Sequence, residues 1–363
     1  MATAQARGPG EYRPFFHWGT RGSRGCIRPS LWPYHGFLAI RPAALCCSLL
    51  FCTLLMLATG CAQLSLLGPD ADGGPRVVAQ QISPSAWLVQ GRAAAGSSAN
   101  QNFISNAGFI VTPAGVVVID ALGSPVLAKK LVAQIRRITP LPITHVIVTH
   151  YHADHIYGLQ VLEAAGANVW AQVKGRDYVG SDAARARLES ARHELAPWVN
   201  DQTEVVPADV WLDGPRELNL GGIKIQILPM GPAHTPEDLV VFLPGEGVLF
   251  AGDLVFSGRI PFVGQANSAR WVQTLDEMLA LKAQTIVPGH GPASQQAVAD
   301  MQLTRDYLLA LRTSMGKAAK NMDPFEEAYK ATNWSAFEKV PLFGPLNRMN
   351  AYNTYLLMER EGN

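Results

Sequence analysis

Three histidines and one aspartate lie within six consecutive residues of this 363-residue chain. The motif His150-x-His152-x-Asp154-His155 offers imidazole and carboxylate groups, which are the nitrogen and oxygen ligands that zinc accepts. So many ionisable groups in one turn would be costly to desolvate unless they shared a cation. The spacing therefore predicts a metal site. Because all five cysteines lie at or before position 61, its ligands must be His, Asp or Glu.

Three further side chains of the same kinds each follow an apolar run: His234 after residues 223–228, Asp253 after residues 248–250 and His290 after residues 285–287. Glycine or proline stands close to each of them, so the backbone can turn sharply and come close to a ligand. Open α/β folds place their chemistry at the carboxyl ends of strands. We therefore expect all seven side chains to converge from four loops that follow strands.

The elements that must position these residues are predicted from hydrophobic patterns and turn residues. A first series of strands is expected at residues 76–80, 86–89, 108–112, 116–120, 143–148 and 169–173. A second series begins near residue 210, at residues 210–212, 216–220, 223–228, 239–243, 248–251 and 285–287. Helices are expected from Ser124-Pro125 to residue 138, from about residue 156, at 269–281, at 293–313 and beyond 324. The pattern predicts two similar halves without a sequence repeat.

The polar residues 176–198 predict a helical excursion from this pattern. Arg185, Arg187 and Arg192 alternate there with acidic residues, which favours a solvated helix face over a lid with a substrate-binding patch.

Composition limits the class of protein. A hydrophobic content of 48% and a charged content of 16% predict a globular chain with a substantial core. The net charge of +1 gives no electrostatic reason to expect nucleic acid as a partner. We expect a small-molecule substrate, and the oligomeric state stays open.

The N-terminal segment has the features of an export signal. Arg41 precedes an apolar run, residues 43–58, that is shorter than the ~20 residues a membrane-spanning helix needs. The run ends at Gly60-Cys61 and resembles a bacterial lipoprotein signal with Cys61 as the lipidated residue. Cleavage after Gly60 by an ordinary signal peptidase and an uncleaved anchor are the alternatives. We therefore predict an exported, periplasmic protein that a lipid on Cys61 would anchor to the membrane.

The ordered set of ligand motifs resembles that of the metallo-β-lactamase superfamily over residues 77–292. The resemblance implies an α/β fold, the αββα four-layer sandwich, with metals at one edge between two sheets. It implies that His150, His152 and His234 hold one metal, that Asp154, His155 and His290 hold a second, and that Asp253 bridges them. Residues 233–238 and 257–262 resemble glyoxalase II-like members and the zinc hydrolases associated with sulfur oxidation and periplasmic quinoproteins.

The composition of the N-terminal segment and the resemblance together suggest a division of the chain. Residues 1–61 would be a leader and signal segment, with residues 1–34 an over-extended gene start or a disordered leader. Residues 62–75 would be a linker, residues 76–315 the metallo-β-lactamase domain and residues 316–363 a helical C-terminal extension.

The implied chemistry is hydrolysis at two Zn²⁺ ions per chain, with iron or manganese as alternatives. Two zinc ions ~3.5–4 Å apart share a water and lower its pKa toward ~7, which supplies hydroxide to attack a carbonyl carbon. Asp154 would orient this nucleophile and take its proton. The leading hypothesis is a secreted or lipid-anchored di-zinc hydrolase of a thioester, a lactone or another activated carbonyl.

Other functions share this motif. A β-lactam hydrolase is disfavoured because subclasses with cysteine at the Asp253 position carry lysine three residues later, where this chain has Phe256. Strict glyoxalase II activity is disfavoured because an exported protein would not meet cytosolic glutathione thioesters. An iron-dependent persulfide dioxygenase and a non-catalytic binding lipoprotein are further alternatives. Phe256, Ile260 and Phe262 are expected either to line an apolar pocket or to pack in the core.

Overall fold

The computed structural model of the protein describes residues 74–362. The predicted leader, the export signal with Cys61 and nearly all of the predicted linker lie outside the described residues. Among the helices between residues 74 and 362, none combines the length and apolar character needed to cross a bilayer.

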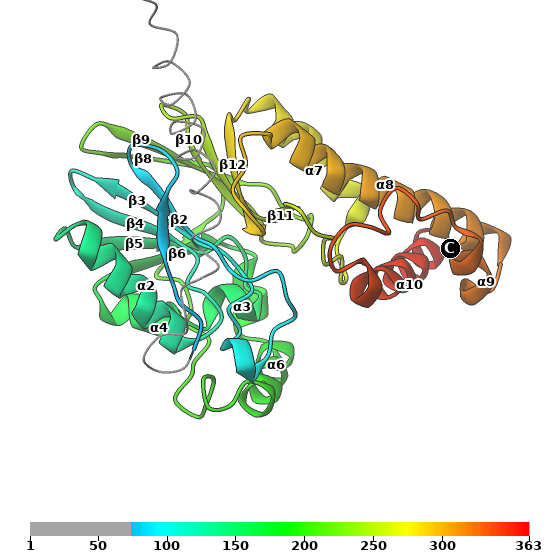
Figure 1. Ribbon diagram of the computed structural model, residues 1–363, viewed down its shortest axis with the longest axis horizontal. Helices are drawn as coiled ribbons and strands as arrows, with labels where there is room; N and C mark the ends of the chain where they lie inside the picture. Colours follow the sequence, from blue (N-terminus) through cyan, green and yellow to red (C-terminus); the bar gives the residue numbers. More distant parts are fainter. Residues whose placement is uncertain (1–73, 363) are drawn as a thin grey trace, which may run out of the picture. The chain divides into compact units, whose positions relative to one another are not determined.

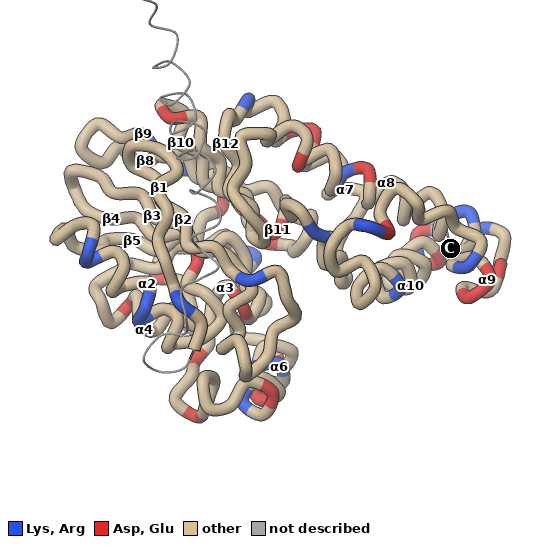
Figure 2. The backbone as a smooth tube through the Cα atoms, in the orientation of Figure 1, with Lys and Arg blue, Asp and Glu red and all other residues tan. Residues whose placement is uncertain are grey.

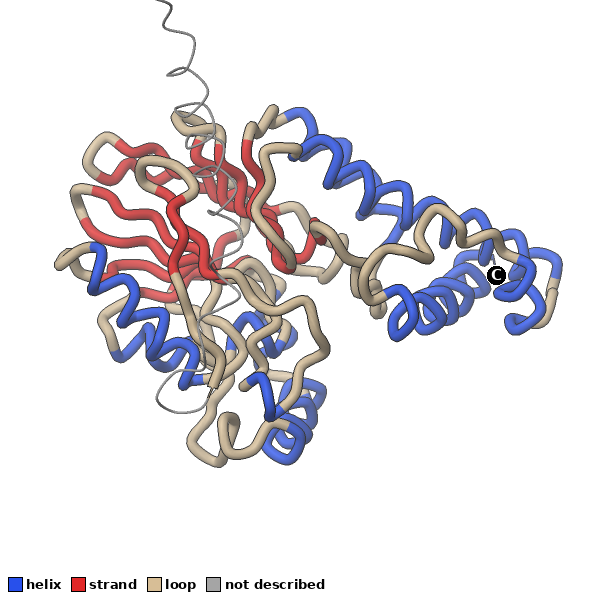
Figure 3. The backbone as a smooth tube through the Cα atoms, viewed as in Figure 1, coloured by secondary structure: helices blue, strands red, loops and turns tan. Residues whose placement is uncertain are grey.

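Two β-sheets form the centre of the described chain, and helices cover their outer faces (Figure 1, Figure 3). The first sheet has the order β1 (Ala79–Gln81), β2 (Ala86–Val89), β3 (Ala107–Thr112), β4 (Gly115–Ile119), β5 (Ile143–Ile147), β6 (Asn168–Gln172) and β7 (Val210–Leu212). The second sheet has the order β12 (Thr285–His290), β11 (Val248–Phe256), β10 (Leu239–Leu243), β9 (Ile223–Pro229) and β8 (Arg216–Leu220). Neighbours in each sheet follow chain order, so each half of the chain builds its own sheet.

The helices are η2 (Ser98–Asn100, a 3-10 turn), α2 (Pro125–Ile138), α3 (Ala153–Ile156), α4 (Leu159–Ala164), α5 (Gly175–Val179), α6 (Asp182–Glu194), α7 (Ser268–Ala280), α8 (Ala297–Asn321), α9 (Phe325–Ala331) and α10 (Phe343–Gly362). Helix α2 begins at the predicted proline. The Ser124 hydroxyl accepts no hydrogen bond from the first turn, however, and donates to the carbonyl oxygen of Gln101 at 2.9 Å. Figure 2 shows basic and acidic residues interspersed along the helices.

Alternating side chains of the central strands pack into two different apolar layers. On β4, Val116 and Val118 belong to the layer between the first sheet and its helices. Val117 and Ile119 belong to the layer between the two sheets. A third apolar layer lies between the second sheet, α7 and the C-terminal helices. Strands buried on both faces explain the continuous apolar runs in the sequence, and the four-layer αββα prediction is confirmed.

Several predicted boundaries are wrong. β7 pairs in parallel with β6, so it belongs to the first sheet rather than to the second series. β11 continues to Phe256, five residues beyond the predicted end, because its pairing with β12 resumes after a register shift. The predicted helical excursion over residues 176–198 is present as two helices, α5 and α6, and the Ser181 hydroxyl caps the second by accepting from Ala184 N at 3.1 Å. Residues 315 and 316, between which a domain boundary is expected, both lie in α8, and the division into domains stays a prediction.

Candidate metal centre

The histidine motif begins where β5 ends. His150 and His152 lie in the predicted loop, whereas Asp154 and His155 lie in the one-turn helix α3, with His152 as its N-cap residue. The backbone of this turn packs closely against the segment that follows β4. A Cβ added at Gly158 would lie 2.0 Å from the carbonyl oxygen of Ala121, and Ala121 N donates to His155 O at 2.8 Å.

The other three predicted residues come from the second sheet. His234 lies in the loop that follows β9, but Asp253 lies inside β11 and His290 is the last residue of β12. The prediction of a loop position is therefore wrong for the last two. The register of β11 against β12 shifts at Gly252, whose φ is +51°, and such a bulge redirects the next side chain. Gly289 is equally constrained, because a Cβ there would lie 2.0 Å from Asp253 Oδ1.

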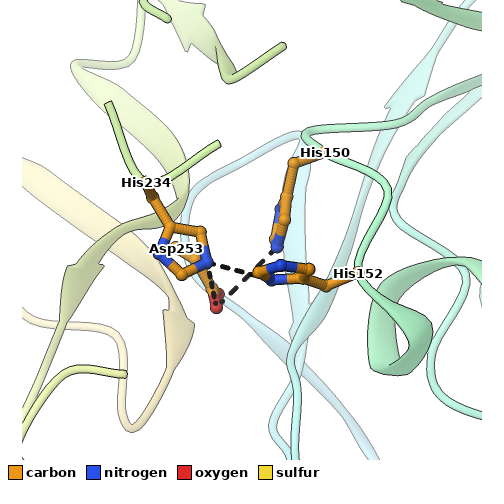
Figure 4. A group of neighbouring side chains, drawn as sticks. All are labelled: His150, His152, His234 and Asp253. Atoms are coloured by element: carbon orange, nitrogen blue, oxygen red, sulfur yellow. Dashed lines mark hydrogen bonds and ion pairs between the residues drawn. The ribbon is translucent and has the colours of Figure 1, made fainter. Parts of the chain in front are cut away.

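The structure brings four of the predicted side chains into one group, His150, His152, His234 and Asp253 (Figure 4). Their ligand atoms all lie within 4.8 Å of one another. His234 Nε2 lies 3.0 Å from His152 Nδ1 and 3.4 Å from Asp253 Oδ2, and His150 Nε2 lies 3.8 Å from the same oxygen. The three imidazoles thus present nitrogen atoms to one point beside a carboxylate.

The remaining three predicted residues, Asp154, His155 and His290, form a second group of the same kind. His290 Nε2 lies 3.2 Å from Asp154 Oδ2. The Asp253 carboxylate also contacts this group, because its Oδ1 lies 3.2 Å from His155 Nε2 and its Oδ2 lies 3.3 Å from His290 Nε2. Asp253 therefore lies between the two groups.

A buried carboxylate that sequence analysis missed holds the first loop in place. Asp120 accepts hydrogen bonds from Thr149 N at 2.7 Å, from Thr149 Oγ1 at 2.8 Å and from His155 Nδ1 at 2.8 Å. Because Thr149 uses its only hydroxyl proton on Asp120, His150 Nδ1 must donate to Thr149 Oγ1, 3.1 Å away. Both histidines therefore carry a proton on Nδ1, and whenever either ring is neutral its lone pair lies on Nε2, toward the group.

The same logic applies to His290. Its Nδ1 lies 2.8 Å from the carbonyl oxygen of Ile104, which can only accept, so Nδ1 carries the proton and Nε2 faces Asp154 and Asp253. The ring stacks on Phe256 with centroids 5.2 Å apart. Phe256 and Ile260 are buried in the core, so the core alternative holds for these two residues.

Burial and neighbouring charges set opposite pKa shifts in the two groups. Burial lowers the pKa of His150 well below its usual value and that of His234 to about 3, so both rings are neutral at pH 7. Burial also lowers the pKa of His155 and His290, but the carboxylates Asp253 and Asp154 outweigh it and raise both pKa values. The surroundings of His155 and His290 therefore stabilise a positive charge at these two rings.

These side chains fit a pair of divalent cations. Within the described residues, His150 Nε2, His155 Nε2 and Asp253 Oδ1 are buried atoms that make no hydrogen bond, although the last two face each other at 3.2 Å. Buried donors and acceptors without partners are costly, and a metal ion would satisfy all three atoms. It would also supply the positive charge that the carboxylates favour at His155. The residues therefore could hold one ion in each group, with nitrogen and oxygen ligands only.

Several nearby histidine and arginine residues lie outside the two groups. His145 is half-buried on β5, where its ring meets Trp170 edge-on and its Nδ1 lies 2.9 Å from Thr144 Oγ1. On α6, Arg185 and Arg192 pair with acidic residues of the same helix, as a solvated face predicts. Arg187 pairs with Glu194 at 2.9 Å but also reaches a cavity beside the cluster.

Two cavities flank the candidate metal centre, each of about 440 Å³. Both are lined by His152, Tyr178 and Phe262, so the pocket alternative holds for Phe262. The first cavity also exposes Asp154 and Arg259. Sequence analysis did not single out Asp120 or Arg259 as site residues. Asp120 carried a usable signal, because it too follows a buried strand.

Comparisons with known proteins agree with this geometry. The sequence model of the metallo-beta-lactamase superfamily matches residues 101–290, more than half of the chain. A linear primary-alkylsulfatase from Pseudomonas sp. (strain ATCC 19151) is 25% identical over 235 residues, which cover 55% of this chain and 44% of that protein. A hydroxyacylglutathione hydrolase from Rhodobacter capsulatus is 31% identical over 147 residues, or 40% of this chain and 47% of that protein. The chain thus spans less than half the length of these two relatives.

Solved structures share the fold. The stereoselective inverting sec-alkylsulfatase from Pseudomonas sp. superposes with a TM-score of 0.59 at 15% identity, covering 77% of this chain and 50% of that one. A metallo-β-lactamase from Pontibacter korlensis superposes with a TM-score of 0.50 at 21% identity, covering 64% of this chain and 99% of that one. The fold, the two groups of ligand-type side chains and the matched family agree, and the chain belongs to the metallo-β-lactamase superfamily.

Proposed function

We propose that the protein is a hydrolase that holds two Zn²⁺ ions and cleaves an activated carbonyl compound such as a thioester or a lactone. One observation carries this proposal: the Asp253 carboxylate lies within 3.4 Å of His234, His155 and His290, between two groups of ligand atoms. His150, His152 and His234 would hold one ion, and Asp154, His155 and His290 the other. Two divalent cations supply Lewis acidity, which lowers the pKa of a bound water and polarises an electrophile.

The chain's own residues would orient the reaction and move a proton. Asp154 is the most suitable proton acceptor: both it and Asp253 line the same cavity, but the side chain of Asp154 is 17% exposed and that of Asp253 only 4%. Burial raises the pKa of Asp154, but His155 and His290 outweigh it and keep the carboxylate ionised at neutral pH. The Ser105 hydroxyl donates to the backbone carbonyl of Asp154 and holds this residue in place. Such preorganisation keeps the acceptor within reach of an attacking water.

A second candidate is hydrolysis of a sulfate ester. It is supported by the alkylsulfatase relative, whose matched region covers 55% of this chain, and by the fold shared with the sec-alkylsulfatase. A sulfate ester also offers an electrophilic centre with anionic oxygens, which divalent cations would bind. We place it second because the hydroxyacylglutathione hydrolase relative has the higher identity, 31%.

The test combines metal content with a substrate screen. Protein purified from its native compartment should contain about two zinc ions per chain by elemental analysis. The zinc-loaded protein should hydrolyse at least one member of a panel of thioesters, lactones, β-lactams and alkyl sulfates. Turnover confined to β-lactams would favour that alternative instead. Iron in the native protein together with oxygen consumption on a persulfide would replace the hydrolase proposal with the dioxygenase.

The non-catalytic alternative has its own test. If Asp154→Asn leaves every assayed turnover unchanged, the protein is better described as a binding lipoprotein. Export to the bacterial periplasm, with or without a lipid on Cys61, also belongs to this proposal. Mass spectrometry of the mature N-terminus would distinguish lipidated Cys61 from a chain cleaved after Gly60.

A further inference from the structure

Arg259 is a buried cation that borders the candidate metal centre without an ion-pair partner among the described residues, although Asp253 and Asp154 attract its charge from a greater distance. Its side chain is 6% exposed, and it lines the cavity that also contains Asp154 and His290. In the part of the chain that the structure describes, no carboxylate oxygen lies within 4.0 Å of its guanidinium, whereas Arg187 at the same cavity pairs with Glu194 at 2.9 Å. Buried arginines normally pair with anions, because an unpaired buried charge is costly.

The guanidinium also makes few hydrogen bonds. Its Nε lies 3.4 Å from the carbonyl oxygen of Ile260, which is a long contact. Its NH1 lies 3.3 Å from His290 Nδ1, but that nitrogen already carries a proton that it donates to Ile104 O. This second contact therefore joins two donors and satisfies neither. The face of the guanidinium packs 5.6 Å from the Phe256 ring centroid, which leaves its N–H edge for a ligand.

Apolar residues line the same cavity, and several of them come from the C-terminal segment. Leu342, Pro345 and Leu346 form its C-terminal wall, and Phe262 and Ile104 also line it. A substrate bound here would place one end on the guanidinium and the remainder on an apolar surface.

The C-terminal segment also holds the loop that carries Arg259. Ile260 N donates to Pro341 O at 2.9 Å, and Val263 N donates to Asn350 Oδ1 at 3.0 Å. Asn350 Nδ2 in turn donates to Pro261 O at 2.8 Å. These contacts fix the position of Arg259 before any ligand binds, which lowers the cost of ordering it.

We propose that the substrate is an anionic amphiphile: Arg259 binds its carboxylate or sulfate group, and the wall formed by Leu342, Pro345 and Leu346 receives its apolar part. This inference rests on the proposed function, because the bound molecule is a substrate only if the site is hydrolytic. It names the class of molecule that this site accepts. The planar guanidinium offers paired N–H donors that match two oxygens of either anion.

The test compares a charged probe with its neutral isostere. Hexanoate, hexyl sulfate and hexanamide are titrated by calorimetry against the zinc-loaded full chain and against the metal-free chain. The variants are Arg259→Met, Arg259→Lys and Arg187→Met, with Arg305→Met as the matched control, because Arg305 pairs with Asp276 outside both cavities.

The wild-type chain should bind both anions more tightly than hexanamide. Arg259→Met should weaken binding of the anions about tenfold or more and change hexanamide binding by less than about twofold, since hydrogen bonds to charged groups are the strong ones. Arg305→Met and Arg187→Met should keep the preference for anions. Without ligand, Arg259→Met should melt at the same or a higher temperature than wild type, because it removes an unpaired buried charge.

Unchanged anion binding in Arg259→Met would overturn the inference, and so would an equal loss for hexanamide. A large loss of stability in both Arg259→Met and Arg259→Lys would assign Arg259 a structural role and overturn it as well. The proposed function fails separately, through absent zinc or absent turnover. In that case the comparison of probes in the metal-free chain still decides whether Arg259 binds anions.

Discussion

Replacing Asp120 by asparagine should weaken one metal site selectively. The carboxylate accepts from three donors, Thr149 N, Thr149 Oγ1 and His155 Nδ1, at 2.7 to 2.8 Å. Asparagine offers one oxygen and one NH₂ group, so at least one of these buried donors would face another donor. The backbone is not the obstacle, because asparagine tolerates the φ of +60° found at this position.

The imidazole of His155 can relieve this donor–donor contact by changing its tautomer. If its proton moves from Nδ1 to Nε2, Nδ1 can accept from the new amide. Nε2 then carries a hydrogen where it would otherwise bind a cation. Loss of such an orienting partner typically costs 10- to 100-fold in metal affinity, which is about 1.4–2.7 kcal/mol. A buried donor left without a partner adds about 1–3 kcal/mol to the loss of folding stability.

Competition titration with a chromophoric chelator measures the two zinc affinities separately. We expect the site of Asp154, His155 and His290 to weaken by about 10- to 100-fold in Asp120→Asn and the other site to change little. Asp209→Asn is the control, because Asp209 also accepts from a backbone amide, Val169 N at 2.7 Å, and belongs to neither group. Two zinc affinities equal to those of the wild type would refute the argument from tautomers.

Three further perturbations test other parts of the structure. Asp154→Asn should lower kcat by about 10²- to 10⁴-fold if this carboxylate takes the proton, and steady-state kinetics with any substrate found in the screen will measure it. Removing zinc with a chelator should lower the melting temperature by roughly 5 °C or more, because ligand at 100 times its Kd stabilises the native state by about 2.7 kcal/mol; an unchanged melting curve contradicts binding to the native state. Partial burial raises the pKa of Glu246, but hydrogen bonds from Ser83 and Ser85 outweigh it and leave the pKa below 4.5. The stabilisation that ionised Glu246 gives the folded state is present above pH 4.5 and is lost as pH falls through the lowered pKa. Glu246→Gln should therefore cost under about 1 kcal/mol at pH 7. It should also make stability, measured by urea titration, fall less steeply at acid pH.

Local spacing was sufficient to predict the first part of the site. His150, His152, Asp154 and His155 are so close in sequence that almost any compact turn brings them together. The buried strands were predictable because both faces of β4 pack on apolar layers, which leaves a continuous apolar run. The four-layer architecture came from the resemblance of the motifs to a known family rather than from periodicity.

Other features depended on which strands become neighbours. Asp120 follows β4, and only the parallel pairing of β4 with β5 brings it to Thr149 and His155. The three-residue strand β7 gave no sign of which sheet it joins, because so short an apolar run fits either one. Asp253 was expected in a loop, because the register shift that carries β11 to Phe256 depends on its pairing with β12.

From the sequence alone, the chemical character of the site was settled: imidazole and carboxylate groups without cysteine, in the order of a known hydrolase family. The family resemblance also implied how those side chains divide into two groups. The tertiary structure alone decided which ring nitrogen each histidine directs inward and where Arg259 meets the C-terminal wall. The physical reason is distance along the chain. The identity of each ligand residue can be read from the sequence. The orientation of its side chain follows from strand pairing and from packing between segments that lie far apart in sequence.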